Sequence, residues 1–243
     1  MRNESASIER ESRTVGRRAR EAGELVVALA GNPNTGKSTL FNVLTGLRQH
    51  TGNWPGKTVE VARGYYRHRG KRITLVDLPG NYSLLANSPE EEVARDFLCF
   101  AQPGAVVVVV DATCLERNLN LVLQVTEITP RMAVCLNLID EARRRGIELD
   151  CTGLAEALGV PVVPTSARRG KGLQQLKDTI DDILTGVIRP APRAVCYDAK
   201  LEACVRELER ELAGLLDGRF SPRWVALRLI SGDHEILKRI KMI

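Results

Sequence analysis

Short, mainly apolar runs alternate along the chain with longer segments that are apolar on one side only. The runs cover residues 25–30, 73–76, 105–110, 132–136 and 160–163, and each ends at a polar or glycine-containing segment. A strand without a polar face is buried on both sides, which is typical of a parallel sheet between layers of helices. We therefore expect an α/β fold with a mainly parallel sheet covered by helices.

The segments between these runs carry apolar residues at helical spacing. They predict helices at residues 38–45, 90–100, 119–128 and 151–158, and a last amphipathic helix at 173–184. One part of the pattern differs. Residues 59–67 and 72–76 flank a short glycine-containing turn, which predicts an antiparallel hairpin attached to the sheet.

Changes of composition divide the chain into three parts. Residues 1–23 mix Arg, Glu and Ser with little apolar content, and form either a charged, disordered leader or a loose helix. Residues 24–188 contain the α/β pattern, which ends before the break at Pro190-Ala191-Pro192. Residues 189–243 predict a small C-terminal all-helical domain.

The helical domain has three expected helices. Apolar residues recur at helical spacing over residues 201–215, a second pattern follows Ser221-Pro222, and a third covers residues 235–243. The apolar faces of so small a unit need a surface to pack on.

Composition and charge narrow the class of protein. The 243 residues carry a formal net charge of +5. Such an excess indicates either that the protein binds an anionic partner or that its positive charges are spread over solvated faces. Aromatic residues make up only 4%, which argues against a stacking surface for single-stranded nucleic acid. The longest apolar run, at residues 105–110, is far shorter than the roughly 18 residues of a membrane span. We expect no secretory signal in the charged first two dozen residues.

Cysteine and histidine residues give no metal-ligand spacing. We expect the cysteines to be buried free thiols of a cytoplasmic protein, because none forms a C-x-x-C pair. They are Cys99, Cys114, Cys135, Cys151, Cys196 and Cys204. We expect His50, His68 and His234 to be isolated surface residues, and we identify no iron site.

The first chemical motif follows the first apolar run. Gly31-x-x-x-x-Gly36-Lys37-Ser38 lies between an expected strand and an expected helix, the context that a phosphate-binding P-loop requires. Its glycines allow the backbone N–H groups to surround phosphates. Lys37 is expected to reach the β- and γ-phosphates, and the Ser38 hydroxyl to bind Mg²⁺.

A second motif, Asp77-Leu78-Pro79-Gly80, ends an expected strand. Asp77 is placed to hold Mg²⁺ through water, and the Gly80 N–H to contact a γ-phosphate. The residue after Gly80 is Asn81, so the glutamine that orients the attacking water in Ras-like enzymes is missing.

A third pair of motifs predicts guanine as the base. The Asp140 carboxylate of Asn137-Leu138-Ile139-Asp140 can accept two hydrogen bonds from a guanine edge, which adenine does not offer. Asn137 is expected to brace this loop and to contact the base, and Ser166-Ala167 to give a backbone N–H to the guanine carbonyl. The alternative is that Asp140 is only a helix N-cap.

Together these motifs resemble the translation-factor-related branch of small GTPases, although Leu138 stands where lysine is typical. Residues 52–60, Gly-Asn-Trp-Pro-Gly-Lys-Thr-Val-Glu, are similar to switch I of FeoB, the bacterial ferrous iron transporter. The segments GNPNTGKSTLFN and DLPGNYSL, residues 111–119, and the tail around Arg223-Trp224 are similar to that family as well. The resemblance covers the chain from about residue 25 to its end.

The resemblance implies a slow, Mg²⁺-dependent GTPase domain (G domain, residues 24–188) joined by the helical domain to a membrane permease part. That part would lie beyond residue 243, on the inner membrane of a bacterium, with this portion soluble on the cytoplasmic side. It implies Thr58 as a switch I ligand of Mg²⁺, and Asn34 as a ligand of an activating K⁺. Small cytosolic Feo proteins are implied partners, while no nucleic acid is expected and the oligomeric state is open. Trp54 is equally compatible with a core position and with a lid.

The expected nucleotide contacts fall on four segments. They are Gly31, Asn32, Pro33, Asn34, Thr35, Gly36, Lys37, Ser38 and Thr39, then Gly56, Lys57 and Thr58, then Asp77, Leu78, Pro79 and Gly80, then Asn137, Leu138, Asp140, Ser166 and Ala167. Of these, Asn34, Lys37, Thr58 and Gly80 are the expected catalytic residues.

Two other functions fit parts of the pattern. A soluble GTPase of ribosome assembly or tRNA modification would use the basic balance for RNA, but no RNA-binding module follows the G domain. A guanine-nucleotide-binding adaptor without catalysis would be separated by single-turnover hydrolysis.

Overall fold

The structure is a computed structural model that describes residues 24–47, 49–53, 59–85, 88–216, 218, 220–233 and 240. The strands are β1 (Leu25–Gly31), β2 (Gln49–Asn53), β3 (Glu60–His68), β4 (Lys71–Asp77), β5 (Ala105–Asp111), β6 (Met132–Asn137) and β7 (Val162–Pro164). The helices are α2 (Lys37–Thr45), α3 (Pro89–Asp96), the π-helical η1 (Phe97–Ala101), α4 (Leu115–Ile128), α5 (Ile139–Arg144), α6 (Cys151–Leu158), the 3₁₀ turn η2 (Ala167–Arg169), α7 (Leu173–Thr185), α8 (Ala199–Ala213) and α9 (Pro222–Ile230).

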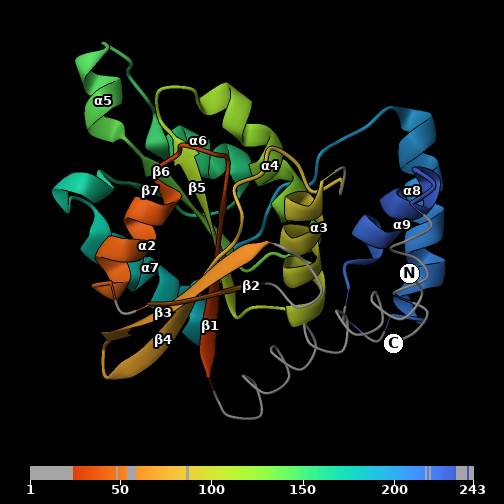
Figure 1. Cartoon of the computed structure of the whole chain (residues 1–243). Coiled ribbons are helices and arrows are strands. Elements are labelled where there is room, and N and C mark those ends of the chain that lie inside the picture. The colour runs from red at the N-terminus through yellow and green to blue at the C-terminus, as the bar shows by residue number, and fades with distance from the viewer. Residues whose placement is uncertain are drawn as a thin grey trace.

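The described strands form one sheet in the order β2-β3-β4-β1-β5-β6-β7 (Figure 1). The five strands from β4 to β7 in this order run parallel, and β2 and β3 add an antiparallel edge. The predicted α/β class, the mainly parallel sheet and the hairpin are therefore confirmed. Because the parallel strands point the same way, the loops at their carboxyl ends meet at one edge of the sheet.

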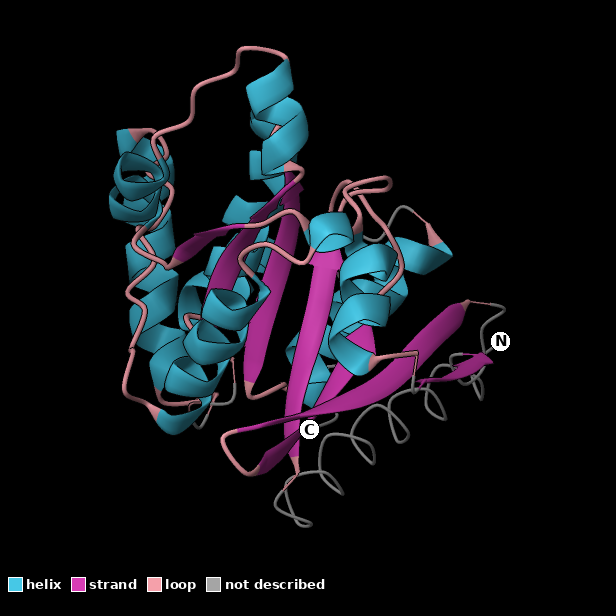
Figure 2. Cartoon of the chain, turned by 90° about the vertical axis from the view of Figure 1, so that its left-hand side faces the viewer, coloured by secondary structure: helices cyan, strands magenta, loops and turns pink. Residues whose placement is uncertain are grey.

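Helices cover both faces of the sheet, as Figure 2 shows. Along β1, Val27 and Leu29 face the core under α2 and α7, while Ala28 and Ala30 face the core under α3, α4 and α6. This division explains why the strand has no polar position: each face of it is a core.

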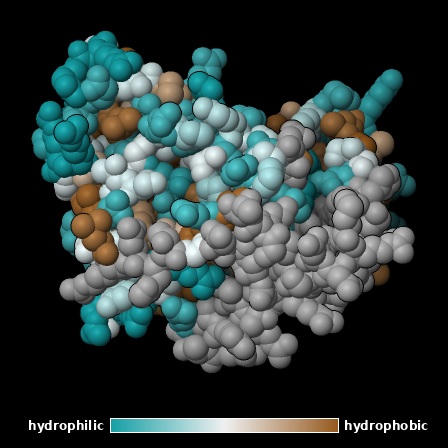
Figure 3. All heavy atoms as spheres, in the orientation of Figure 1, coloured by the Kyte–Doolittle hydropathy of each residue, from teal (hydrophilic) through white to brown (hydrophobic). Residues whose placement is uncertain are grey.

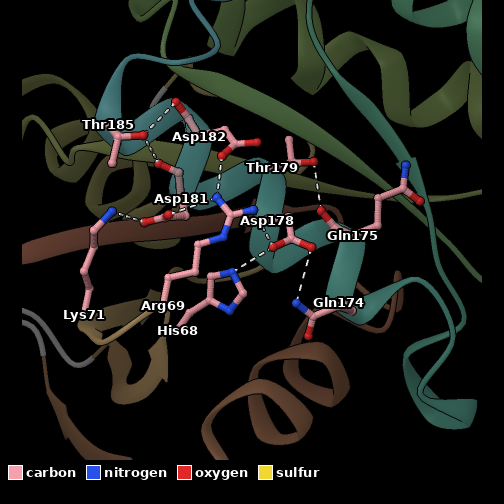
Figure 4. A network of polar contacts seen from close by, with 10 residues as sticks. All are labelled: His68, Arg69, Lys71, Gln174, Gln175, Asp178, Thr179, Asp181, Asp182 and Thr185. Atoms are coloured by element: carbon pink, nitrogen blue, oxygen red, sulfur yellow. Dashed lines mark hydrogen bonds and ion pairs between the residues drawn. The ribbon is translucent and has the colours of Figure 1, made fainter.

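The turn between β3 and β4 is held on α7 by a network of charges (Figure 4). Arg69 and Lys71 contact Asp181, whose side chain is 3% exposed, and His68 Nε2 lies 3.0 Å from Asp178 Oδ1. The prediction that His68 is an isolated surface residue is wrong, because its side chain is only 9% exposed and is paired with a carboxylate. The side chains of His50 and His234 lie outside the described residues.

The C-terminal helices pack on each other and on the α/β unit. Val205 of α8 meets Ala226 and Leu227 of α9 in one buried cluster. Trp224 of α9 joins Phe100 of η1 in another buried cluster, so the C-terminal helices cover η1, which continues α3. The expected third helix at 235–243 lies outside the described residues, apart from Ile240, which packs against this second cluster.

Several boundaries differ from the sequence pattern. The expected helix at 90–100 is α-helical only to Asp96 and continues as a π turn. All five residues of this turn are buried, so we attribute it to tertiary packing. Helix α4 begins at Leu115, four residues before the expected start at 119, and β7 begins at Val162. The short elements β2, α5 and η2 were not expected, because short elements have too little periodicity to be read from sequence.

The prediction that the cysteines are buried is wrong for most of them. Only Cys99 and Cys135 are buried, whereas Cys151 is half-buried. The exposed thiols are Cys114, Cys196 and Cys204. Burial raises the pKa of the Cys135 thiol to about 12, so it remains protonated at neutral pH.

The described part of the chain lacks two features, a membrane-spanning helix and a cluster of His, Cys, Asp or Glu side chains able to hold a metal ion. None of its helices has both the length and the apolar character needed to cross a bilayer. Within the same residues, His, Cys, Asp and Glu side chains nowhere gather in threes in a way that could hold a metal ion.

Candidate functional site

The loop between β1 and α2 needs its glycines. A Cβ on Gly31 would lie 2.6 Å from the Val109 carbonyl oxygen, and one on Gly36 would lie 2.5 Å from Asn137 Nδ2. Gly36 also has φ +80°, a left-handed conformation that other residues adopt at a cost. As the N-cap of α2, Gly36 offers no side-chain acceptor, so the first N–H groups of the helix are left for an anion.

Three side chains meet where this loop faces the end of β4. The Lys37 ammonium pairs with Asp77 Oδ1 and donates to the Leu78 carbonyl oxygen at 2.5 Å. Ser38 Oγ donates to Asp77 Oδ2 at 3.2 Å. The tertiary structure thus joins one cation and two hard oxygen donors, from residues 40 positions apart. A serine hydroxyl beside a carboxylate is a donor set that suits Mg²⁺.

The segment after β4 lies against the same loop. A Cβ on Gly80 would lie 3.3 Å from Pro33 Cα, and the Asn81 N–H donates to the Gly31 carbonyl oxygen at 3.2 Å. Asn34 is exposed on the loop with φ +66°, and Thr39 is exposed in the first turn of α2. The backbone of residues 78–81 is therefore held beside the P-loop, where the Gly80 N–H was expected.

Two buried amides near this point are unusual. Both amide atoms of Asn32 and the Oδ1 atom of Asn81 have no hydrogen-bond partner among the described residues. Each of these residues is 3% exposed. A buried polar atom without a hydrogen-bond partner lowers the stability of the fold. These amides therefore indicate a role other than stabilising the fold, such as binding a ligand.

Asn137, at the end of β6, joins the loop that follows it to the loop between β1 and α2. Its side chain is almost fully buried, and its Nδ2 donates to the Thr35 carbonyl oxygen at 2.9 Å. Its Oδ1 accepts from the Ala167 N–H at 3.0 Å and from Thr165 Oγ1 at 3.2 Å. These three hydrogen bonds tie the loop after β6 to Thr35, Thr165 and Ala167, and the expected contact of Asn137 with the base stays a prediction.

Asp140 lies at the start of α5 but is not its N-cap. Leu138 occupies the N-cap position, with φ +60° and no side-chain cap, and Asp140 follows in the first turn. Asp140 Oδ2 lies 3.0 Å from Arg169 Nε. A hydrogen bond from Ser166, with smaller contributions from the charges of Arg169 and Arg144, holds the pKa of Asp140 below its ordinary value. The carboxylate is therefore ionised at neutral pH and can only accept.

The backbone donors of the last motif already have acceptors. The Ser166 N–H donates to the Lys171 carbonyl oxygen at 3.1 Å, and the Ala167 N–H donates to Asn137. A hydrogen bond from either of them to a guanine carbonyl stays a prediction, and it would be shared with these acceptors.

Some of the expected site residues lie outside the described ones. They are Trp54, Gly56, Lys57 and Thr58. In the other direction, sequence reasoning missed Arg169, which contacts Asp140. The signal was the Arg168-Arg169 pair directly after Ser166-Ala167, but only the fold shows which arginine turns to the carboxylate.

Sequence comparison identifies the family. The family described as "Ferrous iron transport protein B" matches residues 25–180, and the "FeoB cytosolic helical domain" matches residues 197–242. The chain belongs to the FeoB family. This membership confirms the resemblance and favours it over a GTPase of ribosome assembly or tRNA modification.

Relatives of this chain are longer proteins. It is 40% identical over 216 residues to an Fe(2+) transport protein A/Fe(2+) transporter FeoB fusion protein of Porphyromonas gingivalis. It is 37% identical over 219 residues to the Fe(2+) transporter FeoB of Salmonella typhimurium. Each match covers 86% of this chain but 25% and 27% of the relative. The chain therefore spans about a quarter of the length of these curated relatives.

Solved structures of FeoB cytosolic domains share the fold. The T. maritima domain in its apo form has a TM-score of 0.82 and 38% identity, and the match covers 90% of this chain and 86% of that one. The same domain in a GMPPNP form also has a TM-score of 0.82 at 38% identity, with 90% and 85% covered. The T. maritima protein has also been solved in a GDP form.

Proposed function

We propose that this chain binds GTP and GDP, hydrolyses GTP slowly with Mg²⁺, and regulates Fe²⁺ uptake as part of a ferrous iron transporter. The observation that carries the proposal is the meeting of Lys37, Ser38 and Asp77 at the glycine loop. Membership of the FeoB family and the GDP and GMPPNP forms of the T. maritima relative support it.

The phosphate end of the site has a division of labour. The N–H groups at the start of α2 and the Lys37 ammonium bind the phosphates, once Lys37 leaves Asp77. The Ser38 hydroxyl and, through water, the Asp77 carboxylate would hold Mg²⁺, together with Thr58. When bound, Mg²⁺ neutralises charge on the β- and γ-phosphate oxygens. The Gly80 N–H, held beside the P-loop, contacts the γ-phosphate.

The base end selects guanine through Asp140. Its ionised carboxylate accepts from the ring N–H and the exocyclic amine, a pair that adenine lacks. Asn137 contributes by fixing the loop on Thr35, so that the base and phosphate subsites keep one spacing. Leu138 lacks the long aliphatic stem of the usual lysine, which lowers the affinity for the base.

Hydrolysis relies on something other than a glutamine. Asn81 follows Gly80, and its backbone N–H is bonded to Gly31. We assign to Asn34, which is exposed on the P-loop, the role of holding K⁺, and this ion would supply the charge neutralisation that an arginine finger supplies in other GTPases. This assignment predicts hydrolysis that is faster in K⁺ than in Na⁺.

The link to iron transport follows from the family. A membrane permease part of a longer chain would be the element that the nucleotide state controls. The helical domain offers the connection between the nucleotide site and that permease part. Its Trp224 on α9 lines one pocket of about 350 Å³ together with Gln124 of α4 and with Leu84, which follows β4. The relative in which Fe(2+) transport protein A is fused to FeoB supports a small Feo protein as a further partner.

The test compares nucleotides and salts. We expect tight GDP and GTP binding, at least about 100-fold weaker ATP binding, and single-turnover GTP hydrolysis that is faster in K⁺ than in Na⁺. Asn34→Ala should remove the salt difference, whereas Gln175→Ala, the loss of an exposed amide on α7, should keep it. Equal affinity for ATP would refute the guanine site, equal rates in both salts would refute the K⁺ site, and binding without hydrolysis would favour the adaptor.

A further inference from the structure

The guanine-selecting carboxylate is already in contact with a positive side chain of the protein. Arg169 Nε lies 3.0 Å from Asp140 Oδ2, within hydrogen-bond distance. The Asp140 side chain is 20% exposed and the Arg169 side chain is 54% exposed. The carboxylate is thus the more buried of the two groups, and the exposed guanidinium is the one that can move away into solvent.

The donor that Arg169 supplies resembles that of guanine. A guanidinium offers planar N–H groups to a carboxylate, and the ring N–H and exocyclic amine of guanine offer the same kind of pair. Both are therefore recognised by the same acceptor, and full engagement by one leaves less of the carboxylate for the other.

The loop fixes where Arg169 begins but not where its tip ends. Arg169 closes the 3₁₀ turn that starts at Ala167, which is 2% exposed, and its N–H donates to the Ser166 carbonyl oxygen at 3.0 Å. An antiparallel bridge between Ser166 and Lys171 closes the loop on itself. Arg168, its neighbour in the same turn, is exposed and no contact to Asp140 is described for it. The turn thus presents one arginine of two to the base site.

We propose that Arg169 is a specificity-determining residue that competes with guanine for Asp140 and thereby sets the affinity for the nucleotide. The proposal rests on the proposed guanine site. When a ligand must displace an internal partner, it binds only the fraction of protein in which that partner is absent. Its apparent affinity is lower than the intrinsic affinity by that fraction. Exposed ion pairs shift such an equilibrium by up to about fivefold.

The surroundings of Asp140 carry further positive charge without the same contact. Arg143 and Arg144 follow on α5 and Arg145 comes directly after it, and Arg144 and Arg145 pair with Glu141. Figure 3 shows the surface over α5 as strongly hydrophilic. These arginines contribute a positive field, which a substitution of Arg169 leaves in place.

The test measures GDP affinity in Arg169→Ala, with Arg168→Ala as the matched loss of charge from the same turn. We expect Arg169→Ala to bind GDP about two- to fivefold more tightly than the unaltered chain, and Arg168→Ala to bind it unchanged. The gain should be smaller for inosine diphosphate. That base lacks the exocyclic amine and leaves part of the carboxylate to Arg169.

A second background separates this proposal from the base site itself. Asp140→Asn should turn the preference from GDP to xanthosine diphosphate, which tests the guanine site alone. In that background, Arg169→Ala should leave xanthosine diphosphate affinity unchanged, because the carboxylate that Arg169 pairs with is gone. Unchanged or weaker GDP binding in Arg169→Ala, beside an intact switch in Asp140→Asn, would overturn the role of Arg169 and leave the guanine site standing. An equal gain in Arg168→Ala would overturn it too, since the effect would then be one of net charge.

Discussion

Asn137 Nδ2 donates a 2.9 Å hydrogen bond to the carbonyl oxygen of Thr35, which joins the base loop to the phosphate loop. The two residues are 102 positions apart, and both are buried. Because the same amide also holds Ala167, one side chain sets the spacing of three loops. The three loops that carry the proposed nucleotide contacts are therefore held at a fixed spacing.

Gly36 stands beside this amide, and its replacement tests the fixed spacing of these loops. In Gly36→Ala the new Cβ would lie 2.5 Å from Asn137 Nδ2, which three hydrogen bonds prevent from moving. We expect a loss of about 3 kcal/mol of unfolding free energy and a GDP affinity at least about tenfold lower. Urea unfolding and nucleotide titration measure the two effects.

Gly46→Ala is the matched control for this change. Gly46 also has a positive φ, +61°, but a Cβ there meets nothing within 4 Å. It should cost only the backbone strain, about 1 kcal/mol, and leave GDP affinity unaltered. If both variants lost the same stability and Gly36→Ala still bound GDP normally, the close approach to Asn137 would have no consequence.

Gln124 of α4 anchors the segment that follows Gly80. Its Oε1 accepts from the backbone N–H of Leu84 at 2.6 Å, and the Leu84 side chain is buried. Gln124→Leu keeps the volume and leaves that N–H without its acceptor, so we expect a loss of about 1–2 kcal/mol of unfolding free energy. GTP turnover should fall about three- to tenfold because the anchor of the γ-phosphate segment is loosened, while GDP affinity stays the same. Gln175→Leu, on the exposed side of α7, should change neither. A lower GDP affinity with unchanged turnover would contradict the anchoring role.

Glu202 makes the stability of the helical domain depend on pH. Hydrogen bonds from Arg223, and then from the backbone N–H of Tyr197, lower the pKa of Glu202 from its ordinary 4.5 to about 2. A carboxylate with a lowered pKa stabilises the fold fully above its unfolded pKa, and this stabilisation disappears as the pH falls through the folded value. The difference in melting temperature between the unaltered chain and Glu202→Gln should therefore be constant above about pH 5 and close between pH 4.5 and 2. A gap in melting temperature that stayed the same down to pH 2 would contradict this role of the Glu202–Arg223 pair.

Patterns of apolar residues predicted the architecture well because burial on both faces leaves a clear trace. The run at residues 105–110 is the interior strand β5, and the hairpin expected at 59–76 is β3 and β4. The π turn at Phe97–Ala101 left no such trace, since its five buried apolar residues also fit a continued α-helix. Cys204 illustrates the opposite error, because an apolar neighbourhood in sequence did not prevent it from facing solvent on α8.

The sequence by itself determined the chemistry of the site. Glycines at 31 and 36, then Lys37 and Ser38, are local requirements of a loop that surrounds phosphates, and such requirements are written in adjacent residues. Only the tertiary structure decided which groups far apart in the sequence contact one another. It put Asp77 against Lys37 and Ser38, tied Asn137 to Thr35, and turned Arg169 rather than Arg168 toward Asp140. These contacts depend on the order and register of the strands, because the parallel sheet brings the ends of β1, β4 and β6 to one edge, and residues far apart along the chain meet there.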